Sequence, residues 1–89
     1  MTHDIQQTSL RAYHTKEQFA PTQRRRILNA VEKHGNMTNR EIQHETGIII
    51  SSVSARVYEL RCEFHLLELA ELRKCIVSGR QAMAWKVRA

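Results

Sequence analysis

Residues 38–60 read TNREIQHETGIIISSVSARVYEL, and this stretch decides the expected fold. Thr38 is suited to cap a helix, and Glu41 three residues later completes the spacing of a capping box. Gly47 then supplies a left-handed turn. Beyond it, apolar residues recur at helical spacing on one face: Ile50, Val53, Val57 and Leu60. The stretch therefore predicts two short amphipathic helices joined at a glycine, which is the pattern of a helix-turn-helix.

The opposite face of the second predicted helix carries small or polar groups: Ser51, Ser52, Ala55 and Glu59. An ordinary surface helix favours long charged side chains, whereas a face of small residues can approach a major groove closely. Arg56 or Tyr58 would supply a longer contact, and Arg56 paired bidentately with a guanine would contribute about 1–3 kcal/mol. Glu59 would repel phosphate or accept a hydrogen bond from a cytosine amino group. The alternative is an ordinary solvent-facing helix.

The charge of this 89-residue chain is unevenly distributed and favours an acidic partner. The formal net charge is +5, and residues 74–89 contain four basic residues and no acidic one. A second basic cluster spans Arg24 to Arg26, and four acids lie between the two: Glu59, Glu63, Glu68 and Glu71. Such a lopsided basic charge is typical of a phosphate-binding surface, while a solvated surface gives a weaker version of the pattern.

Several classes of function are disfavoured by the composition. No apolar run is long enough to span a membrane, and the N-terminus lacks the layout of a signal peptide, so we expect a cytoplasmic protein. Cys62 and Cys75 are then expected to be reduced thiols. Cys62 and His65 have the spacing C-x-x-H, but a structural zinc site normally needs two paired ligand clusters. Without a nucleophile–base pair or a phosphate-cradling glycine loop, we expect no enzyme, no metal and no cofactor.

Residues that start and end helices divide the chain into an N-terminal segment and one domain. Residues 1–20 are mostly polar and form either an arm or a short helix around positions 9–16, and the domain covers residues 21–89. Pro21 suits the first turn of a helix that ends near His34, with Gly35 as its stop. Its inward residues are expected to be Ile27, Leu28 and Val31. Asn36 and Met37 then form a single-rung strand.

The C-terminal third changes to a period of two, which predicts a β-hairpin. Met83, Trp85 and Val87 alternate with less apolar residues, and we expect Met83 and Trp85 to belong to the core. Ser78-Gly79-Arg80 forms the turn, where glycine permits a positive φ. The alternation of Leu67 and Leu69 breaks between Ala70 and Lys74, which predicts a bulge or a loop in that interval.

The order helix, short strand, helix, helix, hairpin predicts a mainly α fold with a small β-hairpin (α+β). This is a winged helix-turn-helix with a three-helix core and a C-terminal wing. Four motifs also occur in a familiar order: Gln7-Thr8-Ser9-Leu10 with Ala12-Tyr13, Thr38-Asn39-Arg40-Glu41-Ile42, Arg56-Val57-x-Glu59-Leu60 and Val77-Ser78-Gly79-Arg80-x-Ala82-x-x-Trp85. In these motifs the chain resembles small winged-helix proteins encoded by bacteriophages and prophages. The resemblance implies a DNA-binding role in regulating transcription or replication. Such proteins often carry a proline and an asparagine where Ile49 and Ser51 stand here.

Double-stranded DNA is thus the expected partner. The start of the first motif helix can hold a phosphate through exposed N–H groups and one cation, and a basic hairpin suits the backbone or the minor groove. The predicted DNA-binding residues are Thr38, Asn39, Arg40, Ser51, Ser52, Ala55, Arg56, Tyr58, Lys74 and Arg80. The alternative is a winged-helix module that binds a host protein through its helix face or its N-terminal arm, and the acidic cluster is the feature that would test it. A homodimer formed through residues 1–20 or the first helix is also plausible.

Overall fold

A computed structural model describes residues 19–89 of the chain, so the arm or helix predicted for residues 1–20 falls almost entirely outside the described part. The described chain begins with a helix over residues 19–34, here called the N-terminal helix. It continues through β1 (Met37–Thr38), α2 (Asn39–Thr46), α3 (Ile50–Cys62), β2 (Leu67–Lys74) and β3 (Gln81–Val87). The strands form one antiparallel sheet in the order β1-β3-β2. Within residues 19–89, three helices and a hairpin wing thus form a winged helix-turn-helix, which confirms the predicted fold class.

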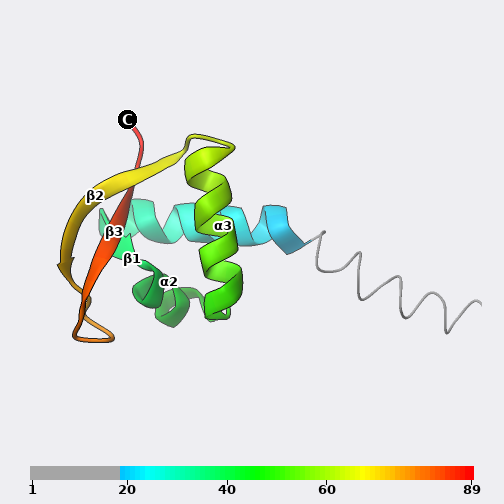
Figure 1. Ribbon diagram of the computed structural model, residues 1–89. Helices are drawn as coiled ribbons and strands as arrows, with labels where there is room; N and C mark the ends of the chain where they lie inside the picture. Colours follow the sequence, from blue (N-terminus) through cyan, green and yellow to red (C-terminus); the bar gives the residue numbers. More distant parts are fainter. Residues whose placement is uncertain (1–18) are drawn as a thin grey trace, which may run out of the picture.

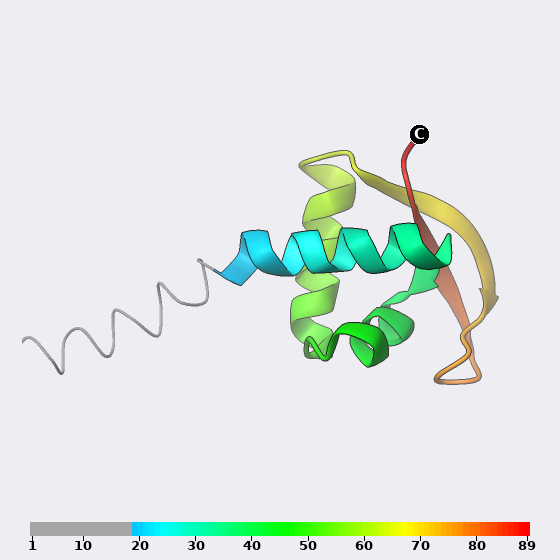
Figure 2. The same ribbon diagram turned by 180° about the vertical axis from the view of Figure 1, so that it is seen from behind.

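The helices pack across one another beside the sheet. In Figure 1, α3 crosses in front of the N-terminal helix, and α2 lies at the end where α3 begins. Figure 2 shows the same arrangement from behind, with the N-terminal helix nearest the viewer. In both views, the loop that joins β2 and β3 lies at the same end of the molecule as α2. The tip of the wing therefore projects at the end where α2 meets α3.

The core is built from the apolar faces that the periodicity predicted. Ile27 and Val31 of the N-terminal helix are fully buried, and Leu28 is partly buried against them. In α3 the buried residues are Val53, Val57 and Leu60, with Ile50 at their edge. Burying a side chain of this size stabilises the fold by roughly 1.5–3 kcal/mol. These residues fix which side of α3 faces the solvent.

The ends of the helices follow local sequence signals. The side chain of Thr38 accepts the N–H of Glu41, while the side chain of Glu41 accepts the N–H of Thr38, so the predicted capping box is confirmed. Gly47 ends α2 with φ +75°, and its N–H donates to the carbonyl of Gln43 at 2.8 Å. The predicted left-handed turn at Gly47 is therefore confirmed. The short strand lies one residue later than expected, at Met37–Thr38.

The hairpin has the predicted break in its register. Leu69 is opposite Trp85 and Glu71 is opposite Ala84, so Ala70 is the extra residue of a bulge. Trp85 is buried as expected, but Met83 is 49% exposed, so its prediction as a core residue was wrong. The physical reason is that β1 pairs with β3 only at Ala84 and Trp85. Met83 lies beyond that pairing and is opposite Leu72, which is itself 60% exposed.

Candidate nucleic-acid interface

The exposed side of α3 contains part of the predicted small-residue face. Ser51 and Ala55 are exposed, Ser52 is half-buried, and Tyr58 is 59% exposed. Ser54, which the sequence analysis did not select, is also exposed. α3 thus presents three small side chains to the solvent over its first two turns, followed by one tyrosine.

Arg56 and Glu59 face the N-terminal helix rather than the open solvent. Arg56 Nη2 donates to Glu59 Oε2 at 2.8 Å, and its Nη1 lies 3.4 Å from Gln23 Oε1. Arg24 Nη1 donates to the other oxygen of Glu59, also at 2.8 Å. Burial opposes ionisation of Glu59, but the hydrogen bonds from Arg24 and Arg56 outweigh it and lower the pKa of the carboxyl group. The structure therefore keeps Arg56 and Glu59 apart from the exposed residues of α3.

Arg61 is a second residue that the sequence analysis missed. It lies seven residues after Ser54 and three after Tyr58, so the three share one side of α3. Its guanidinium stacks on the ring of Trp85, with Cζ 4.2 Å from the ring centroid. Trp85 Nε1 in turn donates to Asn39 Oδ1 at 2.9 Å. The helical spacing alone placed Arg61 beside Tyr58, but its stacking on Trp85 depends on how the hairpin packs against α3.

The start of α2 contributes one exposed cation. Thr38 is buried, and its hydroxyl is occupied by the capping box and by a 3.0 Å contact with Cys75 Sγ. Asn39 is half-buried and is held by Trp85 and, at 3.5 Å, by Ser54. Arg40 is exposed, with Nη1 3.2 Å from Gln43 Oε1. Of these predicted contact residues, Arg40 is the one whose charge reaches the solvent.

The wing carries Lys74 and Arg80 at the two ends of its turn. Both are exposed, and within residues 19–89 neither is part of an ion pair. The N–H of Cys75 donates to the carbonyl of Arg80, and the N–H of Gly79 donates to the carbonyl of Cys75, each at 2.8 Å. The turn is therefore a defined structure that presents two cations.

The remaining charged clusters are partly neutralised within the fold. Arg24 pairs with Glu59 and lies over the ring of Phe64 at 4.7 Å, while Arg26 donates to the carbonyl of Thr46. Arg25 is exposed. In the acidic cluster, Glu59 is paired as described above, and Glu68 is 3.6 Å from Lys86. Neither cluster therefore acts as a block of free charge.

Between residues 19 and 89, no group of three or more His, Cys, Asp or Glu side chains is arranged to hold a metal ion. Cys62 is exposed, whereas Cys75 is buried against Thr38. No helix in this range has both the length and the apolar character needed to cross a membrane.

The fold and this surface define the class of protein as a winged helix-turn-helix. Residues 22–61 match a protein-family model described as winged helix-turn-helix DNA-binding. The matched region runs from the N-terminal helix through α2 and nearly all of α3, and it ends before the hairpin. Neither a curated protein nor a solved structure matches the chain.

Proposed function

We propose that this protein binds double-stranded DNA as a regulator, with α3 in the major groove and the wing on the backbone or in the minor groove. The observation that carries the proposal is the exposed side of α3, with Ser51, Ser54 and Ala55, in a domain whose wing presents Lys74 and Arg80. Small side chains let a helix approach base edges, and cations neutralise phosphates. The family model matched by residues 22–61 supports the same function.

The proposed DNA contacts differ from those predicted from the sequence at Arg56. Arg56 would have to leave Glu59 and Gln23 before it could reach a guanine. Arg61 is better placed, because it lies on the exposed side and its guanidinium is already oriented by Trp85. Arg40 would contact a phosphate at the start of α2, with Thr38 and Asn39 holding the backbone there. Tyr58 would supply a longer contact beside the serines, and Ser52 would lie at the edge of the interface.

Sequence preference should be weak in this arrangement. Serine hydroxyls donate or accept hydrogen bonds equally well, so they do not discriminate strongly between base pairs. Control of transcription or replication in a phage or prophage is the finer part of the proposal, and it rests on the resemblance of the sequence motifs.

Fluorescence anisotropy with a labelled duplex of mixed sequence tests the proposal. We expect binding at low salt, at about 50 mM, that weakens steeply as salt increases because counterions are released from neutralised phosphates. Arg25→Ala is a matched control, because Arg25 is exposed on the N-terminal helix rather than on α3 or the wing. A wild-type protein without affinity at low salt would refute DNA binding.

A protein-binding role is the second candidate, and the exposed apolar residues of the hairpin favour it. Leu72 and Met83 are opposite each other, and Met83 lies two residues from Trp85, so all three share one face of the sheet. Leu69, Leu72 and Met83 are each about half exposed or more. Leu72→Ser distinguishes the two functions: unchanged DNA affinity with loss of regulation in cells supports a protein partner, whereas loss of DNA affinity opposes it.

A further inference from the structure

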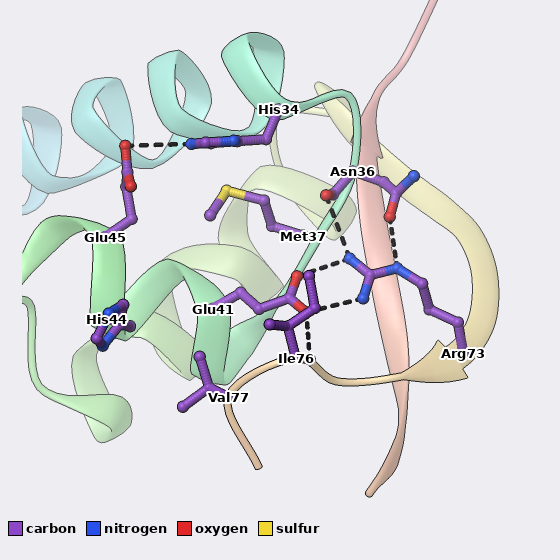
Figure 3. Close-up of a pocket in the computed structure, with 9 residues that line it drawn as sticks. All are labelled: His34, Asn36, Met37, Glu41, His44, Glu45, Arg73, Ile76 and Val77. Atoms are coloured by element: carbon purple, nitrogen blue, oxygen red, sulfur yellow. Dashed lines mark hydrogen bonds and ion pairs between the residues drawn. The ribbon is translucent and has the colours of Figure 1, made fainter. Parts of the chain in front are cut away.

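The end of β2, next to the turn of the wing, is joined to the start of α2 by a bidentate ion pair. Arg73 Nη1 donates to Glu41 Oε2 at 2.7 Å, and Arg73 Nη2 donates to Glu41 Oε1 at 2.6 Å. The side chain of Glu41 is 8% exposed and that of Arg73 is 22% exposed. Figure 3 shows the two side chains meeting across the gap between α2 and the hairpin. The planar fork of arginine fits a carboxylate in a single geometry, so this contact orients its partners as well as attracting them.

Each member of the pair is held by further hydrogen bonds. Glu41 also accepts the N–H of Thr38 at 3.1 Å and the N–H of Ile76 at 2.9 Å. Arg73 Nε donates to Asn36 Oδ1 at 2.8 Å, and Nη2 lies 3.3 Å from the carbonyl of Asn36. One carboxylate therefore connects the helix start, the end of β2 and the loop after it.

The hairpin needs such an attachment because its outer part lacks apolar support. Beyond Ala84, β3 no longer pairs with β1, and the facing residues Leu72 and Met83 are largely exposed. Near the turn, the hairpin is joined to the helix-turn-helix by the hydrogen bonds of Glu41 and by the buried contact between Thr38 and Cys75. The direction in which the wing projects therefore depends on polar contacts at the start of α2.

We infer that Glu41 and Arg73 are positioning residues of the DNA-binding surface, which hold the wing so that Lys74 and Arg80 reach the duplex together with α3. The inference rests on the proposed DNA binding. Arg73 does not contact a phosphate itself, because its donors are used by Glu41 and Asn36. It contributes to binding by holding the wing in place. Glu41, although negatively charged, strengthens binding to a polyanion.

Glu41→Gln tests this inference, because overall charge and wing positioning predict changes of opposite sign in DNA affinity. Removing a negative charge should tighten DNA binding if only the overall electrostatic attraction matters. If Glu41 positions the wing, the same change should weaken binding by roughly three- to tenfold at about 0.1 M salt, which corresponds to the loss of one phosphate contact. Glutamine still completes a capping box, so α2 keeps its cap. Glu45→Gln is the matched control, because Glu45 lies one turn later on α2 and pairs with His34 at 3.2 Å outside the wing contact.

Two further variants separate positioning from charge. Arg73→Lys keeps the charge but loses the fork, and we expect it to weaken binding as much as Glu41→Gln does. Arg80→Ala should then add little in the Glu41→Gln background, because the wing contact is already lost. Tighter binding by Glu41→Gln, to the extent seen for Glu45→Gln, would overturn the inference.

Amide hydrogen exchange of residues 74–80 in the free protein provides a measurement that does not involve DNA. Glu41→Gln should speed exchange in the wing while thermal unfolding confirms that the domain remains folded. Failure of the wild type to bind DNA would reject the proposed function. Unchanged amide exchange in Glu41→Gln would separately show that Glu41 does not position the wing.

Discussion

At the scale of single residues, ionisation of the Glu41 carboxyl group makes the free energy of unfolding depend on pH. Its hydrogen bonds from Arg73 lower its pKa from 4.5 to about 2, assisted by the N–H groups of Ile76 and Thr38 and opposed by burial. A lowered pKa in the folded state means that the stabilisation is complete above pH 4.5 and is lost as the pH falls towards 2. The contribution at neutral pH is roughly 3 kcal/mol. We expect urea unfolding to show a fall in the free energy of unfolding over this pH range.

The Glu41→Gln variant isolates this contribution from the other acids. Glu45 and Glu59 also have lowered pKa values, so they add to the acid sensitivity of the wild type. The difference in free energy of unfolding between wild type and variant should be largest near neutral pH and should shrink below pH 4.5. A difference independent of pH would contradict the assigned role of the ionised carboxylate.

Arg56 is expected to affect stability rather than DNA preference. Its side chain is 16% exposed and is bonded to Glu59 and Gln23. Arg56→Ala should lower the free energy of unfolding by about 1–2 kcal/mol, because Glu59 then loses one of its two guanidinium partners. Denaturation and binding to a panel of duplexes check this together. An altered preference among DNA sequences, with unchanged stability, would instead support the contact between Arg56 and a guanine that the sequence predicted.

Local spacing in the sequence revealed only part of these residue roles. Thr38 and Glu41 are three residues apart, so their capping box could be predicted without tertiary structure. The second role of Glu41 depends on Arg73, which lies 32 residues later in a strand with a bulge. The pairing of Glu59 with Arg24 spans 35 residues and depends on how α3 crosses the N-terminal helix.

At the scale of elements, the joint between α2 and α3 depends on Gly47. Its φ of +75° is rarely adopted by other residues, while an added Cβ would meet nothing within 4 Å. Gly47→Ala should therefore destabilise the domain by about 1 kcal/mol through backbone strain and not through a clash. Chemical denaturation measures the change. Wild-type stability in this variant would show that the joint tolerates another conformation.

The hairpin shows what an alternating pattern can and cannot predict. The pattern correctly indicated two strands, an irregularity after Leu69 and a buried Trp85. It assigns residues to the two faces of a sheet, but it does not show how far the covering helices extend along that face. Met83 was therefore misplaced, although it lies on the same face as Trp85. The part of this face beside β1 and Arg61, which includes Trp85, is buried, whereas the part nearer the turn is exposed.

At the scale of the whole molecule, the net charge of +5 does not measure the charge available to DNA. Arg24, Arg56 and Arg73 are engaged by Glu59 and Glu41 within the fold. The cations left for the proposed interface are Arg40, Arg61, Lys74 and Arg80. Three of these four, all but Arg61, were predicted from the sequence as DNA contacts, but the sequence could not separate free cations from paired ones.

The cations of the proposed interface set the size of the salt dependence. If Arg40, Lys74 and Arg80 each neutralise one phosphate while Arg61 contacts a base, the logarithm of the binding constant should fall with the logarithm of salt concentration with a slope of about −2.7 per domain. Arg80→Ala should reduce the magnitude of the slope by about 0.9, whereas Arg25→Ala should leave it unchanged. A homodimer bound to two half-sites would double the slope to about −5, so sedimentation of the free protein should accompany the titration. A slope near zero, despite measurable affinity, would mean that the complex forms without these cations.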